Sequence, residues 1–165
     1  MAIKVAIITV SDKGARGERK DEAGPLIEKI LKEKLEVQVV LRRVVPDEVE
    51  LIKKGLMEAC ELGADLVLTT GGTGVSPRDV TPEATKEVIE RELPGFSEAM
   101  RMEGFKKTPH AIISRGLCGI RGGTLIINLP GSPRAVKESL EVILPAVPHA
   151  LEKLKGDTTE CGQEV

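Results

Sequence analysis

The sequence contains no tryptophan and no tyrosine, and its only phenylalanines are Phe96 and Phe105. Proteins that bind single-stranded nucleic acid without sequence preference stack bases on aromatic side chains, and that platform is missing here. The formal net charge of −2 also gives no broad basic surface for a phosphate backbone. We therefore expect no nucleic-acid partner.

Cysteine and histidine are also scarce. The three cysteines, Cys60, Cys118 and Cys161, show no C-x-x-C spacing, and only His110 and His149 could join them. This pattern predicts neither a zinc site nor a disulfide framework. We expect reduced thiols, as in a cytoplasmic protein, and we interpret both histidines as structural.

Long hydrophobic runs are absent as well. The apolar stretch at 5–10 is too short to span a membrane, and no small-residue cleavage site follows it. We expect neither membrane insertion nor export. The 165 residues, 41% hydrophobic and 30% charged, suit one globular domain over 1–155 with a polar C-terminal tail over 156–165.

Strand-like and helix-like segments alternate along the chain. Such alternation predicts a parallel or mostly parallel sheet with helices on both faces. The expected strands span 3–10, 37–45, 64–70, 111–113 and 124–129, the second of them at an edge or rim of the sheet. The expected helices span 21–35, about 47–63, 82–92, 96–104 and 133–154, the last broken near Pro145 and Pro148.

The segment at 69–85 (TTGGTGVSPRDVTPEAT) holds the most informative pattern. Three glycines directly follow an apolar strand, so the backbone can approach a ligand and present its N–H groups to an anion such as phosphate. Thr81 followed by Pro82 is typical of a helix N-cap. The turn matches neither the dinucleotide-binding pattern nor the P-loop, and a purely structural turn remains an alternative.

Four segments are expected at the carboxyl ends of the strands, where such sheets bind ligands: 11–17, Asp47, 71–79 and 128–132. Asp47 and Asp79 would form a plausible magnesium site there, because Mg²⁺ binds one or two carboxylates together with phosphate oxygens. The alternative is that each aspartate is a helix N-cap.

The parts of other reaction classes are missing. No serine lies in a G-x-S-x-G elbow, so the sequence does not predict a serine nucleophile of that kind. Four apolar residues recur at helical spacing, and we expect them to lie in the core or in a subunit contact: Phe96, Met100, Met102 and Phe105.

These motifs together resemble the Mog-type molybdopterin adenylyltransferases, members of the MoaB/Mog family that also includes the G domains of gephyrin and of plant Cnx-type proteins. The resemblance covers about residues 3–155. It is carried by the segments 8–12 (ITVSD), 45–47 (VPD), 68–74 (LTTGGTG), 78–85 (RDVTPEAT), 94–96 (PGF), 114–115 (SR) and 129–132 (LPGS).

The resemblance implies a three-layer α/β/α sandwich with a mostly parallel central sheet, usually in a homotrimer. It also implies transfer of AMP from Mg-ATP to the terminal phosphate of molybdopterin, with release of pyrophosphate. The partner that it implies is the molybdenum-inserting protein of the same pathway. Asp47 and Asp79 match catalytic positions, and Ser114 matches the pterin-binding region. By position, the residues implied in binding the nucleotide or the pterin phosphate are Gly71, Gly72, Thr73, Gly74, Ser76, Ser114, Pro130, Gly131 and Ser132.

Three alternatives to this enzyme stay open. One is a MoaB-like pterin-binding protein without transferase activity, although relatives of that kind tend to lose the run that is intact here at 78–82. A second is a scaffold module, and a third is an enzyme acting on another nucleotide. For the transferase, the attacking phosphate oxygen is already anionic, so we expect Asp47 and Asp79 to hold Mg²⁺ rather than to remove a proton.

Overall fold

The computed structural model describes residues 1–158 and contains a six-stranded sheet in the order β2-β1-β3-β6-β5-β4. Neighbours from β2 to β6 are parallel, and β5 runs against both β6 and β4. The expectation of a mostly parallel sheet with the second strand at its edge is confirmed. The strands are β1 (Ile3–Val10), β2 (Val37–Val45), β3 (Leu66–Thr70), β4 (Arg91–Glu92), β5 (Cys118–Arg121) and β6 (Thr124–Leu129).

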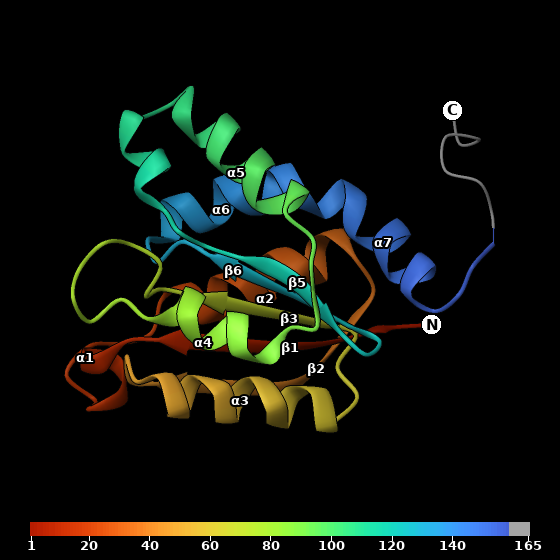
Figure 1. Ribbon diagram of the computed structural model, residues 1–165, viewed down its shortest axis with the longest axis horizontal. Coiled ribbons are helices and arrows are strands. Elements are labelled where there is room, and N and C mark those ends of the chain that lie inside the picture. Colours follow the sequence, from red (N-terminus) through yellow and green to blue (C-terminus); the bar gives the residue numbers. More distant parts are fainter. Residues whose placement is uncertain (159–165) are drawn as a thin grey trace.

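Helices cover both faces of the sheet, which gives the three-layer α/β/α sandwich. Side chains of β1 alternate between the faces: Val5 and Ile7 pack with α2, α6 and α7, whereas Ala6 and Ile8 pack with α3 and α4. Figure 1 shows α3 on one side of the sheet and α6 and α7 on the other. The helices are α1 (Asp12–Ala15), α2 (Ala23–Lys34), α3 (Val49–Glu61), α4 (Thr81–Val88), α5 (Gly95–Phe105), η1 (Pro109–Ile113), α6 (Pro133–Ile143), η2 (Leu144–Ala146) and α7 (Val147–Leu154).

The last helical segment is interrupted as expected. Pro145 lies in the 3₁₀ turn η2, between α6 and α7, and Pro148 lies in the first turn of α7. A proline is tolerated at these positions because the first N–H groups of a helix have no intrahelical partner.

Two expected elements differ from the structure, and two short strands, β4 and β5, were not expected. The segment at 111–113 belongs to the 3₁₀ helix η1, whose start is capped by the Thr108 hydroxyl accepting from the His110 N–H. The helix expected over 82–92 ends at Val88, and β4 follows it. Strand β5 was missed because its glycines suggested a loop. A β-carbon at Gly119 would come within 2.7 Å of the Arg91 carbonyl oxygen, so glycine permits the strand to lie against that segment.

The carboxyl ends of β1, β2, β3 and β6 lie at one edge of the sheet, on the left in Figure 1. Backbone hydrogen bonds link neighbouring segments there, from the Ser11 N–H to the Val45 carbonyl at the end of β2 and from the Gly71 N–H to the Leu129 carbonyl. The segment at 11–17 is not only a loop, because it contains the single-turn helix α1. This edge is the place where the strand order brings separate loops together.

Two of the three cysteines lie in the part of the chain that the structure describes, and both are free thiols. Burial raises the pKa of the Cys118 thiol to about 12, so this side chain stays protonated and inert near neutral pH. Cys161 lies outside the described residues. No helix within 1–158 is long and apolar enough to cross a membrane.

Candidate functional site

The glycine segment leaves β3 as a turn whose conformation requires glycine. Gly71 and Gly72 have φ angles of +94° and +67°. A β-carbon at Gly71 would press on the carbonyl oxygen of Val10, and one at Gly72 would press on the hydroxyl of Thr81. The turn is therefore packed tightly between β1 and the start of α4, and both glycines have a structural reason to be there.

The expected N-cap role of Thr81 was wrong. Helix α4 begins at Thr81 itself, after Val80, and the buried Thr81 hydroxyl donates to the Gly71 carbonyl oxygen at 3.0 Å. The side chain thus holds the glycine turn instead of capping the helix.

Replacing Gly71 by alanine is expected to lower the unfolding free energy by at least about 2 kcal/mol, or about 4–8 °C in Tm. Gly63→Ala is the matched control, because Gly63 has a φ of +79° but open space around its α-carbon. Both variants carry the backbone penalty, and only Gly71→Ala adds the contact with Val10. Thermal unfolding by circular dichroism measures the difference, and equal losses in the two variants would contradict this packing argument.

Asp47 and Asp79, from separate loops, both lie against the glycine turn. A β-carbon at Gly72 would be 3.1 Å from Oδ1 of Asp47, and one at Gly74 would be 2.9 Å from Oδ2 of Asp79. The structure thus brings together the two aspartates that the sequence singled out. The turn also supports Asp79 directly, because the Ser76 N–H donates to its Oδ2 at 3.0 Å.

Asp47 does not cap α3, contrary to the alternative interpretation. Its Oδ2 accepts the Asp12 N–H at 2.9 Å, and its own N–H donates to Oδ1 of Asp12, also at 2.9 Å. Arg78 then binds Asp12 through two hydrogen bonds, Nε to Oδ2 at 3.0 Å and Nη2 to Oδ1 at 2.9 Å. Sequence reasoning gave Asp12 no role, since these partners are 35 and 66 residues away along the chain.

The two linked carboxylates have opposite electrostatic environments. The hydrogen bonds from Arg78 and from the Asp47 N–H lower the pKa of Asp12 to about 2. Burial raises the pKa of Asp47, and the neighbouring carboxylates of Asp12 and Asp79 raise it further. Arginine therefore neutralises Asp12, whereas the charge of Asp47 is disfavoured by its surroundings.

These features fit a cation held by few protein ligands. Oδ1 of Asp47 accepts no hydrogen bond from residues 1–158, and it faces the turn beside Asp79. A cation bound here would relieve the repulsion that raises the pKa of Asp47. No group of three or more His, Cys, Asp and Glu side chains in the described chain is arranged to hold a metal.

Arg115 fixes the far side of the same loop, a role that sequence reasoning missed. Its backbone N–H donates to the Thr73 carbonyl at 2.7 Å, and its Nε donates to the Gly74 carbonyl at 2.7 Å. Its Nη2 also donates to the Asp79 carbonyl at 2.9 Å. The guanidinium forms a two-bond ion pair with Glu83 on α4, at 2.7 and 3.0 Å. Arg115 therefore ties the glycine turn and Asp79 to a helix.

Two cavities lie on either side of the segment that joins β6 to α6. The first, of about 480 Å³, lies among α5, η1 and α6 and is lined by Ser114, Pro130 and Ser132 among others. The second, of about 620 Å³, is lined by Gly131 and Ser132 together with the charged side chains Arg19, Lys20, Asp21 and Glu22. Both volumes are in the range of small-molecule sites.

The segment between the cavities is joined to the glycine turn. The Thr70 hydroxyl donates to the Pro130 carbonyl at 2.7 Å, and a β-carbon at Gly131 would be 3.3 Å from the α-carbon of Gly71. The Ser132 hydroxyl caps α6 by accepting the Ala135 N–H at 3.2 Å. The sequence-predicted residues thus occupy one continuous region. They lie in the loop after β3 (Gly71, Gly72, Thr73, Gly74, Ser76, Asp79), after β2 (Asp47), after η1 (Ser114) and after β6 (Pro130, Gly131, Ser132).

Comparison with known proteins gives a consistent result. Residues 6–149 match the family model described as a probable molybdopterin binding domain. A molybdopterin adenylyltransferase of Helicobacter pylori is 42% identical over 164 residues, covering 98% of this chain and 93% of the relative. The Escherichia coli protein of the same name is 38% identical, covering 99% of this chain and 91% of the relative. The crystal structure of a molybdopterin biosynthesis enzyme MoaB from Thermus thermophilus is similar with a TM-score of 0.87 and 52% identity, covering 94% of this chain and 98% of that one.

Proposed function

The chain belongs to the MoaB/Mog family of molybdopterin-binding proteins, and from that membership we propose that it transfers an adenylyl group to molybdopterin. Relatives named molybdopterin adenylyltransferase are 38–42% identical over nearly the whole chain. The protein is accordingly an enzyme of molybdenum cofactor biosynthesis. A pterin-binding protein without activity and a scaffold module are not favoured by these relatives.

We propose ATP as the adenylyl donor and the terminal phosphate of molybdopterin as the acceptor. A phosphate oxygen of molybdopterin forms a bond to the α-phosphorus of ATP, and the bond from that phosphorus to the bridging oxygen breaks. Pyrophosphate leaves with the electron pair. Since the nucleophile is already an anion, the main obstacle is repulsion between two anions, which positioning and neutralisation of charge reduce.

The observation that carries this proposal is the position of Asp47 and Asp79 on a glycine turn that contacts Gly131, in the segment between the two cavities. We assign the first cavity, next to Ser114, to the pterin. The second cavity and the glycine turn would take the nucleotide, with Arg19 and Lys20 near its phosphates. Mg²⁺ held by the two aspartates would supply neutralisation of phosphate charge.

Pyrophosphate release tests the proposal directly. The purified protein, given molybdopterin and Mg-ATP, is expected to form pyrophosphate and adenylylated molybdopterin in equal amounts. Omitting molybdopterin or Mg²⁺ is expected to abolish both products. Binding of pterin without release of pyrophosphate would instead identify an inactive pterin-binding protein, and equal turnover of unrelated nucleotides would point to another enzyme.

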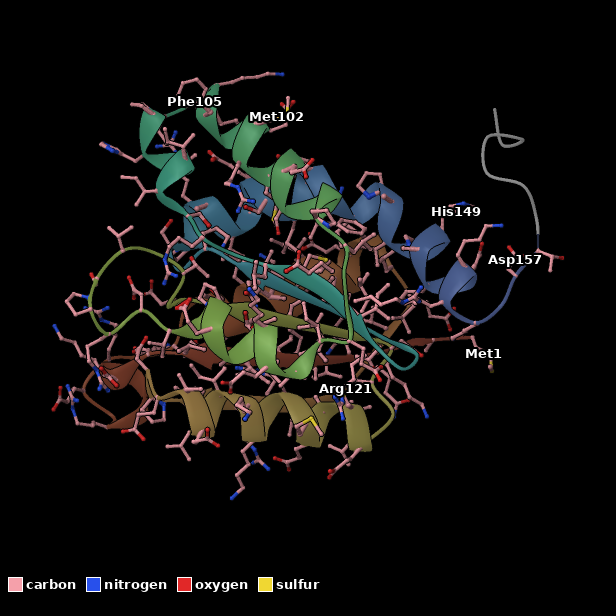
Figure 2. The ribbon with its side chains drawn as sticks, viewed as in Figure 1. Met1, Met102, Phe105, Arg121, His149 and Asp157 are labelled. Atoms are coloured by element: carbon pink, nitrogen blue, oxygen red, sulfur yellow. The ribbon has the colours of Figure 1, made fainter. Side chains whose placement is uncertain are left out.

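We also propose a homotrimer, with an apolar patch on α5 and η1 in its interface. Four large hydrophobic side chains there are exposed to 45–68%: Met102, Phe105, Ile112 and Ile113. Figure 2 shows Met102 and Phe105 on α5, away from the sheet. The two helical segments are closely packed, because a β-carbon at Gly104 would be 2.9 Å from the β-carbon of Ala111. Burying such a patch against another copy would remove apolar surface from water.

Phe105→Glu is expected to convert the trimer to monomers, because a charge would then have to be buried in the contact. Leu62→Glu is the control, since Leu62 is also exposed but lies at the end of α3. Light scattering after size-exclusion chromatography gives the mass of each variant. A monomeric wild-type protein, or a trimer that survives Phe105→Glu, would contradict the proposed interface.

Residues 1–155 are proposed to form a single domain, followed by a polar tail at 156–165. The proposed location is the cytoplasm, where the product would pass to the molybdenum-inserting protein of the same pathway. The scarcity of cysteine and the relation to biosynthetic enzymes support this placement.

A further inference from the structure

The hydroxyl of Ser97, in the first turn of α5, has an unusual environment. The residue is only 3% exposed, and its Oγ is the one buried side-chain polar atom without a hydrogen-bond partner among residues 1–158. Buried polar groups in folded proteins are nearly always paired, so each exception calls for an explanation. A ligand that completes the hydrogen bond is one such explanation.

Ser97 lies in the wall of the first cavity, the one beside Ser114. Met100 of the same helix, Ala111 of η1 and Val142 of α6 form apolar parts of the wall. The residue that carries the unpaired hydroxyl therefore belongs to the wall of a space large enough for a small molecule.

Two other polar residues of this wall, Arg101 and Asn128, already have partners. Arg101 donates from Nη1 to the carbonyl oxygens of Gly116 at 3.0 Å and Ser114 at 3.4 Å. The amide of Asn128 donates to the hydroxyls of Thr69 and Thr85 and accepts the Leu117 N–H. These two side chains hold the wall of the cavity together, whereas the Ser97 hydroxyl has no partner.

We infer that the Ser97 hydroxyl binds the polar edge of the pterin ring system of molybdopterin. This inference rests on the proposed function and adds a binding residue to it. A pterin is a flat heteroaromatic ring that suits apolar walls, and its amide and amino edge carries both donors and acceptors. A serine hydroxyl can donate and accept, so it matches either kind of atom.

Ser97→Ala separates this role from a structural one. Because the hydroxyl has no partner in the free protein, its removal is expected to leave the Tm unchanged or raised. The Kd for molybdopterin is expected to rise about tenfold, the effect of losing one hydrogen bond of about 1.4 kcal/mol. The KM for ATP should not change. Glu98→Ala is the control, because Glu98 lies on the exposed side of the same turn of α5. It tests whether a substitution in this turn changes the Kd for molybdopterin without removing the Ser97 hydroxyl.

Pterin fluorescence measures the affinity directly, since the chain has no tryptophan or tyrosine whose emission would interfere. An unchanged Kd in Ser97→Ala would overturn the inference, and so would a lower Tm of the free variant, which would mean that the hydroxyl is already bonded. Failure of the transferase proposal would look different: the wild-type protein would bind pterin and release no pyrophosphate, whatever residue stands at 97.

Discussion

Asp47→Asn is expected to lower adenylyl transfer by about 10²- to 10³-fold while the protein remains folded, an effect comparable with losing one preorganised electrostatic group of an active site. Asparagine has nearly the shape of aspartate, and its carbonyl oxygen can still accept the Asp12 N–H that now binds Oδ2 at 2.9 Å. Only the charge is removed. If the charge holds Mg²⁺, transfer falls and pterin binding persists.

The stability of this variant has a pH signature with a defined sign. The pKa of Asp47 is raised in the folded protein by burial first and then by Asp12 and Asp79, so its ionised form destabilises the fold. That penalty is present above the folded pKa and disappears below the ordinary value of 3.8, where the carboxyl is protonated in both states. Asp47→Asn should therefore be at least as stable as the wild type at pH 7, and any advantage should vanish as the pH falls toward 3.8.

A Mg²⁺ titration of pyrophosphate release measures the catalytic effect, and thermal unfolding without substrates measures the stability. Asp65→Asn is the matched control, because Asp65 also accepts a backbone N–H, that of Lys4 at 2.9 Å, but lies at the other end of β3. Wild-type activity of Asp47→Asn at every Mg²⁺ concentration would refute the metal-holding role. Loss of both transfer and fold would show that the carboxylate is structural.

The strands β1, β3 and β6 could be predicted because their residues are apolar in nearly continuous runs, as expected for strands buried on both faces. Strand β2 is β-branched but carries Arg42 and Arg43, which is typical of the edge position that it occupies. The short strand β5 has too few residues to show such a pattern. Its Gly119 lies close to the carbonyl oxygen of Arg91, a contact that the sequence does not reveal. The error at 111–113 has the same origin. Three apolar residues suit a strand or a 3₁₀ turn equally, and the Thr108 cap decides between them.

The candidate site was predictable as a set of loops but not as a set of contacts. Parallel strands end at the same edge of the sheet, so Asp47 and the glycine turn had to lie near each other. Nothing in the spacing reveals that Asp47 exchanges hydrogen bonds with Asp12, or that Arg78 pairs with Asp12 across 66 residues. These contacts depend on how each loop folds back, which is a tertiary property.

Arg115 is another residue whose tertiary contacts could not be predicted from the sequence. Its replacement gives the second large effect that we expect on adenylyl transfer. Arg115→Lys is expected to reduce transfer by about 10²-fold, a cost comparable with misplacing a catalytic group by about 1 Å. Lysine keeps the charge, but its single ammonium cannot replace a planar fork that reaches Gly74, Asp79 and Glu83 together. The loop that carries Asp79 would then be free to shift relative to α4. Arg115 is thus a positioning residue that acts through Asp79.

The readout that separates positioning from general destabilisation is the Mg²⁺ dependence. If Arg115 sets the place of Asp79, Arg115→Lys should need more Mg²⁺ for half-maximal transfer, whereas the Kd for pterin should change little. Arg121→Lys is the control, because Arg121 also donates to a distant carbonyl, that of Val88 at 2.9 Å, but lies on β5, away from the loop (Figure 2). An unchanged Mg²⁺ requirement, or an equal loss in Arg121→Lys, would contradict the positioning role.

Acidic pH offers an independent test of the same contact. The hydrogen bonds from Arg115 lower the pKa of Glu83 below its ordinary value of 4.5, so the ion pair is intact throughout the neutral range. The contribution of this ion pair to the free energy of unfolding is fully present above the ordinary pKa of 4.5. It is lost as the pH falls through the lowered pKa of Glu83 in the folded protein. Glu83→Gln removes the pair at every pH, and transfer by this variant should fall less than in Arg115→Lys. The reason is that the arginine still binds the carbonyls of Gly74 and Asp79, so the backbone contacts, more than the ion pair, hold the aspartate against the glycine turn.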